Sequence, residues 1–282
     1  MNDPLHAVVC LKATPCPDTV AELAANGQLR LDESGRALRL AHVPHGIYGF
    51  DEQALGTVVE LARSAVHAGG VQGGGAWRTT AVSVAPADPD VVFRRAFELG
   101  VEDGLLVTVG VDGSGGGHAA GGASGARGVA PLLSAAVRSL GADLVVMGAS
   151  SCDGGSGTVG PTVAALLGLP CVAAARALQV DGRRLRALRS TGDAGGETVE
   201  VDLPAVVTVL DDGWEPVQPR AADILAARGR TVTRWEPTDG TVPPAVGRTA
   251  MTVDRAANRG ELLDGDPAAV AAALLDRIGG VR

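Results

Sequence analysis

The chain has 282 residues, of which 46% are hydrophobic and 20% charged, and its formal net charge is −8. This length allows one large or two modest domains with a packed core. The acidic balance argues against nucleic acid as a main partner, because a phosphate backbone requires a basic surface. Three Phe, three Trp and one Tyr leave the core to Val, Leu and Ala, and make base-stacking surfaces unexpected.

Cysteine spacing and hydropathy argue against metal-binding, membrane-spanning and secreted proteins. The four cysteines, at positions 10, 16, 152 and 171, show no CxxC or other metal-binding spacing. His42 and His45 stand three apart but have no further ligands near them in sequence. No apolar run approaches the roughly 20 residues that a membrane span needs, and the first residues do not resemble a signal peptide. We therefore expect no metal, no membrane span and a cytoplasmic location.

Apolar runs alternate with helical patterns over the first part of the chain. The patterns predict strands at 6–12, 79–84, 105–109, 144–147 and 203–209, and helices at 51–68, 89–99, 129–140 and 161–168. In the helix at 89–99, Asp88 is the expected N-cap. Strands alternating with helices predict an α/β fold with a mostly parallel, doubly wound sheet. Right-handed crossovers then place the carboxyl ends of the strands, and any ligand, along one edge.

The pattern changes in the second part of the chain. Segments 173–180, 184–190 and 198–202 predict a small antiparallel meander. The glycine-rich stretch 110–128 predicts a surface loop, the proline-rich region 236–248 a linker or an extended arm, and 266–278 a closing helix. We therefore expect an α/β domain at 1–235 and a C-terminal arm and helix at 236–282.

The segment after the strand at 144–147 has the features of an anion-binding loop. It spans thirteen residues with five glycines, whereas a simple connection takes about two to six residues. Glycines let main-chain N–H groups approach a ligand, and the following helix, expected to open at Pro161, presents unpaired N–H groups and a positive dipole end. The candidate ligand-binding residues here are Gly148, Cys152, Asp153, Gly154, Gly155, Ser156, Gly157, Thr158, Val159 and Gly160.

A second candidate is Lys12, the only lysine of the chain. It ends the first predicted strand, where ligands of parallel sheets bind. A role in the site is favoured over a plain surface charge.

Several separate motifs follow one another in an order that is typical of one family. They are Val8-Val-Cys-Leu-Lys12 with Pro17-Asp18-Thr19, Tyr48-Gly49-Phe50-Asp51-Glu52-Gln-Ala-Leu55, Asp153-Gly-Gly-Ser-Gly-Thr-Val-Gly-Pro161, Leu203-Pro-Ala-Val-Val-Thr208 with Glu215-Pro216, and Arg259-Gly260-Glu261 with Asp264-Gly265-Asp266. Together they resemble the beta subunit of electron-transfer flavoproteins over nearly the whole chain.

The resemblance implies a fold like that of the adenine-nucleotide alpha-hydrolases and a heterodimer with an alpha subunit. The alpha subunit carries most of a redox-active FAD that is shared with beta, and beta buries AMP or, in bifurcating members, a second FAD. The chain would then be an electron carrier subunit and not an enzyme. Besides the loop, the resemblance assigns Cys10, Lys12, Tyr48, Gly49, Phe50, Asp51 and Val84 to the nucleotide site.

The chain also departs from the family pattern. Gly155 stands where an aspartate is usual and Thr158 where a glutamine is usual, which weakens side-chain selection of one nucleotide. Tyr48 replaces an asparagine, so adenine stacking would substitute for a hydrogen bond. The partner-docking region, Asp211 to Arg220, lacks the usual Leu-Pro that follows it. This indicates an unusual dehydrogenase partner or a specialised branch, such as the mycofactocin-associated one.

Purely structural roles for some of these residues, and other functions for the chain, are alternatives to this interpretation. Asp51 is also explained as a helix N-cap, and Cys10 and Val84 as core residues. The competing function is a stand-alone adenine-nucleotide-binding module of the stress or sensor type. An ATP-splitting enzyme has no support, because no catalytic arrangement of lysine and aspartate is visible.

Overall fold

The computed structural model describes residues 4–67, 77–85, 90–108, 125–192, 195–210, 218–237, 251–253 and 263–279. The chain forms two compact units, Met1–Thr252 and Val253–Arg282. The division predicted at residue 235 stays a prediction.

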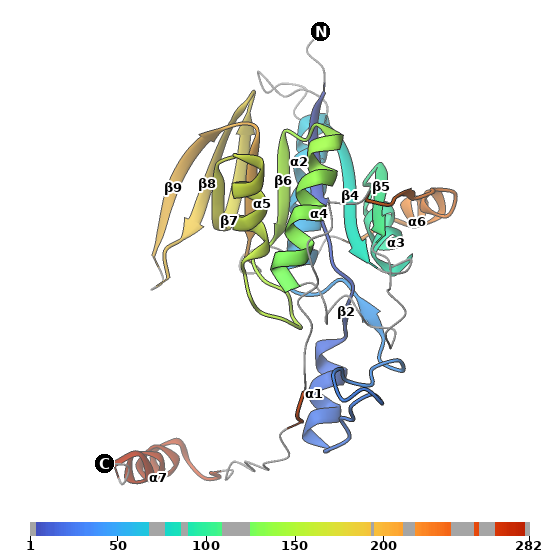
Figure 1. Cartoon of the computed structure of the whole chain (residues 1–282). Helices are drawn as coiled ribbons and strands as arrows, with labels where there is room; N and C mark the ends of the chain where they lie inside the picture. Colours follow the sequence, from blue (N-terminus) through green and yellow to red (C-terminus); the bar gives the residue numbers. More distant parts are fainter. Residues whose placement is uncertain are drawn as a thin grey trace. The chain divides into compact units, whose positions relative to one another are not determined.

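The first unit is built on one large sheet (Figure 1). Its strands are β1 (Leu5–Cys10), β4 (Trp77–Ala85), β5 (Asp103–Thr108), β6 (Leu144–Gly148), β7 (Cys171–Asp181), β8 (Arg184–Ser190), β9 (Gly196–Asp202), β10 (Ala205–Val209) and β11 (Thr233–Trp235). Their order is β11-β5-β4-β1-β6-β10-β7-β8-β9. Neighbours from β11 to β7 are parallel, and β7, β8 and β9 form an antiparallel meander. The mostly parallel sheet and its meander are confirmed.

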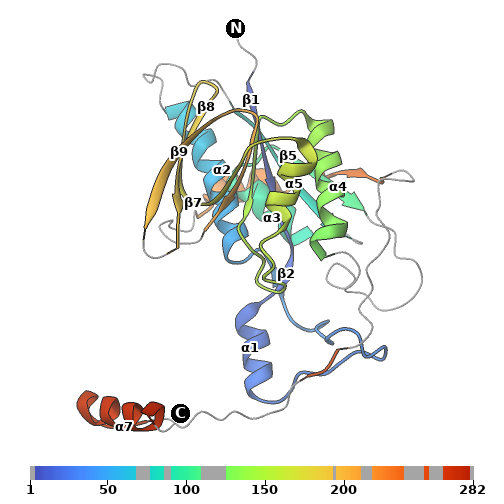
Figure 2. The same ribbon diagram turned by 60° about the vertical axis from the view of Figure 1, so that its left-hand side comes forward.

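Helices cover both faces of this sheet (Figures 1 and 2). On one face α2 (Phe50–His67) and α3 (Asp90–Leu99) pack a core that includes Leu55 and Phe93. On the other face α4 (Gly125–Leu140) and α5 (Val159–Leu167) pack a second core that includes Leu132 and Val163. Because helices lie on both sides, the central strands β1, β6 and β10 are mostly apolar along their length and do not alternate apolar with polar residues. The doubly wound architecture predicted from the sequence is therefore confirmed.

Several helix boundaries differ from the predicted ones. Helix α5 begins at Val159, so Pro161 is its third residue and not its first. Helix α2 begins at Phe50, so Asp51 lies inside the first turn and is not the N-cap. Helix α4 begins at Gly125, within the stretch predicted as loop. Asp88, and residues 238–248 of the arm predicted at 236–248, lie outside the described residues.

Five short elements were not predicted. They are α1 (Pro17–Ala25), β2 (Thr14–Pro15), β3 (His45–Gly46), α6 (Ala221–Ala227) and β11. Elements of two or three residues carry too little periodicity to be recognised in a sequence. Strand β11 adds a further parallel edge to the sheet beside β5, and α6 packs against α3.

The second unit contains α7 (Pro267–Gly279), which agrees with the helix predicted at 266–278. None of its described residues is buried, and Leu274, Leu275 and Ile278 are exposed.

The packing of α3 on β5 gives a stability test. Phe93 is 1% exposed, and a Cβ on Gly104 would stand 2.9 Å from the rings of both Phe93 and Phe97. Phe93→Ala should lower the free energy of unfolding by about 3–5 kcal/mol, because it leaves a cavity. Val91→Ala, on the same helix but 38% exposed, should cost less than about 1 kcal/mol. Urea denaturation measures both, and equal losses would contradict this packing.

Candidate functional site

The site lies where neighbouring strands end. In the sheet register, Cys10 at the end of β1 stands beside Val82 of β4 and Met147 of β6. Val84 and Gly148 follow within two residues on these two strands. The structure thus brings three predicted site residues to one edge, the edge at which open parallel sheets bind ligands.

Asp51 joins this edge to helix α2. Its Oδ2 accepts a hydrogen bond of 2.8 Å from the main-chain N–H of Lys12, and it also accepts one from the N–H of Gly148. A Cβ on Gly148 would collide with Asp51 Oδ1 and stand 2.9 Å from Phe50 Cβ. Desolvation by the surrounding protein raises the pKa of Asp51 to about 7. One carboxylate therefore holds the ends of β1 and β6 together.

Lys12 crosses from β1 to the glycine-rich loop. Its Nζ lies 2.7 Å from Oδ1 and 2.6 Å from Oδ2 of Asp153. Hydrogen bonding and the charge of Lys12 offset the desolvation of Asp153 and lower the pKa of that carboxyl. Both side chains are about one-third exposed or less, at 33% and 28%, so the pair contributes at most about 1 kcal/mol to stability. Its effect is on position: it ties the loop tip to the first strand.

The loop itself is folded and largely exposed. The N–H of Gly155 donates to the carbonyl of Ser151 at 2.9 Å, which closes a turn around Asp153. Gly155 and Gly157 have φ values of 63° and 61°, in the left-handed region that favours glycine. A Cβ on Gly157 would stand 3.2 Å from the carbonyl oxygen of Ala149, so the loop closes tightly at this point.

Helix α5 begins without a cap from its own sequence. Its N-cap residue, Thr158, makes no side-chain bond to the helix, and its hydroxyl donates instead to Ser156 Oγ at 3.3 Å. The first N–H groups of a helix have no partner within the helix. The start of α5 therefore presents main-chain donors and the positive end of a dipole beside two hydroxyl groups.

Two glycines fix the loop against its neighbours. A Cβ on Gly160 would collide with Thr208 Cγ2 of β10, which shows that α5 approaches that strand closely. Gly49 has a φ of 58°, and a Cβ there would stand 3.0 Å from Cys152 Sγ. The turn before α2 and the loop after β6 are therefore in contact.

Tyr48 faces another part of the molecule. A Cβ on Gly46 would stand 3.0 Å from its ring, so the ring lies over β3. Its hydroxyl hydrogen-bonds Cys16, the N-cap residue of α1. Hydrogen bonds from Thr19 and, to a smaller extent, Tyr48 lower the pKa of the Cys16 thiol. This structure thus places the Tyr48 ring beside the β2–β3 ladder and not in it.

Cys10 lies beneath the site. It is 5% exposed, and burial raises the pKa of its thiol to about 12, with the nearby Asp51 adding to the shift. It is therefore protonated at neutral pH and packs as a small apolar residue.

One contact residue of the site had no signal in the sequence. Thr208 of β10 lies in a different element from Gly160, which it contacts. Gly160 was predicted as a ligand-binding residue, but its contact with strand β10 was not predicted.

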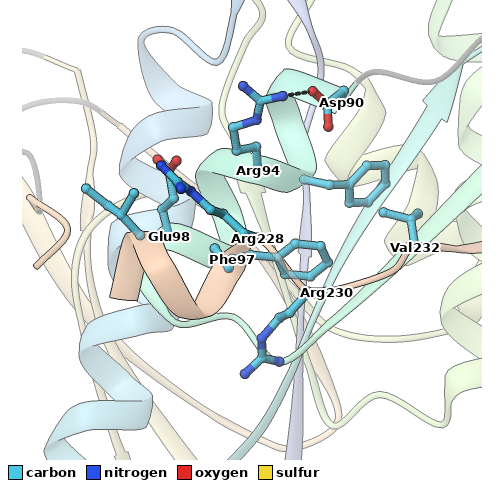
Figure 3. A pocket seen from close by; sticks show the side chains of 10 residues that line it. Asp90, Arg94, Phe97, Glu98, Arg228, Arg230 and Val232 are labelled. Carbon is cyan, nitrogen blue, oxygen red and sulfur yellow. Dashed lines mark hydrogen bonds and ion pairs between the residues drawn. The ribbon is translucent and has the colours of Figure 1, made fainter. Parts of the chain in front are cut away.

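A separate hollow of about 340 Å³ lies between α3 and α6 (Figure 3). Its apolar lining is Phe93, Phe97, Ile224, Ala227 and Val232, and its polar lining is Asp90, Arg94, Glu98, Arg228 and Arg230. Arg94 pairs with Asp90, and the Arg230 guanidinium carbon stands 5.9 Å from the centre of the Phe97 ring. Two of its three arginines, Arg94 and Arg230, thus interact with other residues of the lining.

The part of the chain that is described contains neither a metal-binding cluster nor a membrane-spanning helix. Within it, no three His, Cys, Asp or Glu side chains gather in a way that holds a metal ion. None of its helices combines the length and the apolar character that crossing a membrane requires.

Comparison with known proteins assigns the chain to a family. The electron transfer flavoprotein domain matches residues 44–240, well over half of the chain. The chain belongs to the electron transfer flavoprotein family. The match covers both the turn at Tyr48–Asp51 and the loop at 148–160.

The relatives of this family member are beta subunits. The electron transfer flavoprotein subunit beta of Clostridium acetobutylicum is 27% identical over 236 residues, which are 83% of this chain and 80% of the relative. That of Thermoanaerobacterium thermosaccharolyticum is 26% identical over 208 residues, 74% of this chain and 72% of the relative. That of Mycobacterium leprae is 40% identical over 93 residues, 33% and 35% of the two chains. The beta-subunit resemblance seen in the sequence is therefore confirmed.

The contact between Gly148 and Asp51 gives a second stability test. Gly148→Ala should lower the free energy of unfolding by about 1–3 kcal/mol, because the new methyl group displaces Asp51 and Phe50. Gly154→Ala is the control in the same loop: its Cβ would stand 3.3 Å from the Ser151 hydroxyl, which can rotate away. It should cost less than about 1 kcal/mol in thermal or urea unfolding. A larger loss for Gly154→Ala would contradict the geometry.

Proposed function

We propose that the chain is an electron carrier subunit, and not an enzyme, that pairs with an alpha subunit and holds a structural AMP or a second FAD. Family membership supports the pairing. The observation that carries the nucleotide is the start of α5, which has no side-chain cap and follows a glycine-rich loop. A phosphate is the ligand that completes such a helix end.

The groups that fit the phosphate are mostly main-chain. The N–H groups of the exposed segment from Ser156 to Thr158 are available, together with the hydroxyls of Ser156 and Thr158. Lys12 adds a positive charge that is already shared with Asp153. Gly157 has no Cβ that would keep a phosphate away from these N–H groups. A nucleotide that binds only the folded chain would stabilise it by mass action.

The remaining partners follow from the family. A FAD shared with the alpha subunit supplies the redox chemistry when bound, and this chain contributes by holding it near its donor. A dehydrogenase would dock near Asp211–Arg220, of which residues 218–220 are described. The exposed Leu274, Leu275 and Ile278 of α7 suit packing on a partner subunit. No transmembrane helix is found among the described residues, and we propose a cytoplasmic location.

Co-expression with a neighbouring alpha-like subunit tests the pairing. We expect a yellow heterodimer, and extraction of its nucleotides followed by chromatography should give FAD together with AMP, or FAD alone in excess. The competing candidate is a stand-alone adenine-nucleotide-binding module. A colourless monomer that binds ATP by itself would favour that candidate and reject the subunit.

A matched pair of glycine variants tests the nucleotide position. Gly157→Ala should lower nucleotide occupancy several-fold, because its Cβ enters the loop next to the Ala149 carbonyl oxygen. Gly182→Ala has nearly the same φ, 56°, in open space at the β7–β8 turn, so both variants carry a similar backbone strain of about 1–2 kcal/mol. Occupancy should stay normal in Gly182→Ala. Equal occupancy in the two variants would place the nucleotide elsewhere.

A further inference from the structure

Asp51 occupies an unusual position for a carboxylate at a ligand edge. Its carboxylate binds the main-chain N–H groups of Lys12 and Gly148, and not the hydroxyl groups of Ser156 and Thr158 in the loop. These two residues begin the two segments that carry the candidate ligand groups, the β1–α1 connection and the β6–α5 loop. The state of this one carboxyl group therefore affects both segments.

The glycine-rich loop lies close to this carboxyl group. Gly148, the first residue of the loop, is in contact with Asp51, and Cys152 of the loop is in contact with Gly49, two residues before it. The side chain of Lys12 joins the same region to Asp153 at the loop tip. An anion held by this loop is thus within electrostatic reach of Asp51, in surroundings that screen charge less than water does.

We propose that Asp51 couples phosphate binding at the glycine-rich loop to the uptake of one proton. Ionised, its carboxylate bridges the ends of β1 and β6. A phosphate anion in the loop shifts it to the protonated form, and the proton comes from the solvent. Asp51 acts here as a positioning residue, and the proposal rests on the proposed nucleotide site.

The charges around Asp51 leave it sensitive to an added anion. The ionisable groups closest to Asp51 on the neighbouring elements are Cys10 on β1, Lys12 just after it, Glu52 on α2, and Asp153 and Cys152 in the loop. His6 lies toward the other end of β1, and Glu60 and Arg63 lie two or more turns further along α2. Cys10 is neutral because burial raises its pKa, and Glu52 is paired with Arg95 of α3. Lys12 favours the ionised form of Asp51, whereas Asp153 opposes it. A phosphate would add to the second effect.

The direction of the pH effect follows from the pKa of about 7 that desolvation gives Asp51 in the free chain. Below pH 7 the carboxyl group is mostly protonated, so an anion meets no extra repulsion. Above pH 7 it is ionised in the free chain and must take up a proton when the anion binds. The affinity for a phosphate ligand should therefore fall as pH rises, by at most tenfold per pH unit for one proton.

Calorimetric titration of the full chain, freed of nucleotide, tests this coupling. Between pH 7.0 and 8.5 the Kd for AMP should rise by about fourfold or more, because a phosphate with a second pKa near 6 stays doubly charged in this range. In Asp51→Asn, which keeps an acceptor oxygen but cannot ionise, the Kd should change less than about twofold. Adenosine, which lacks the phosphate, should show no pH dependence with the unchanged chain.

A second measurement avoids variants. Carbon-13 NMR of the Asp51 carboxyl group should show its pKa rising by about one unit or more when AMP is added. A pKa that stays constant or falls would overturn the proposal, as would equal pH profiles for the unchanged chain and Asp51→Asn; the nucleotide site would stand in either case. If neither AMP nor FAD binds between pH 5 and 9, the nucleotide site is wrong and the coupling is rejected with it.

Discussion

The hydrogen bond between the Lys12 N–H and the Asp51 carboxylate joins parts of the chain that are 39 residues apart. With the contact to Gly148, it fixes the first strand, the first helix of the α/β core and the strand that leads into the glycine-rich loop. A parallel sheet places strand ends at one edge but does not set the spacing of the loops that leave it. Here a partly protonated carboxyl group sets that spacing, so the geometry of the edge depends on a group that titrates near neutral pH.

The charge balance of the edge complements this arrangement. Lys12, the only lysine of the chain, is already paired with Asp153, and Asp51 lies beside both. Main-chain N–H groups and two hydroxyls are therefore the principal donors for an anion. Such a site is suited to a ligand that is held for structure, because it offers no excess of positive charge to drive a reaction at phosphate.

The central layers of the fold were predictable from the sequence because their signal is long and regular. The apolar runs at 144–147 and 203–209 and the meander turns gave the sheet, since buried strands and helices repeat over many residues. The short elements α6 and β11 were not predictable, because so few residues carry little periodicity. The start of α2 was not predictable either, because a helix end is set by tertiary contacts. Asp51 illustrates this: its sequence position suggests an N-cap, but its partners are Lys12 and Gly148, which no local pattern reveals. Likewise Gly160 was marked for a ligand, whereas its contact with Thr208 of β10 could only be seen in the structure.

The glycine-rich loop combines a rigid base with a tip that has open space. Gly148 and Gly160 are each blocked by neighbouring side chains, while a Cβ on Gly155 would meet nothing within 4 Å. Over evolutionary time, the two ends of the loop would be expected to resist replacement, and the tip to accept other residues at the cost of a strained backbone. A lineage of this kind can change which ligand it prefers without rebuilding the sheet edge. The family resemblance implies an aspartate at position 155, and the glycine found there in this chain would be a change of this type.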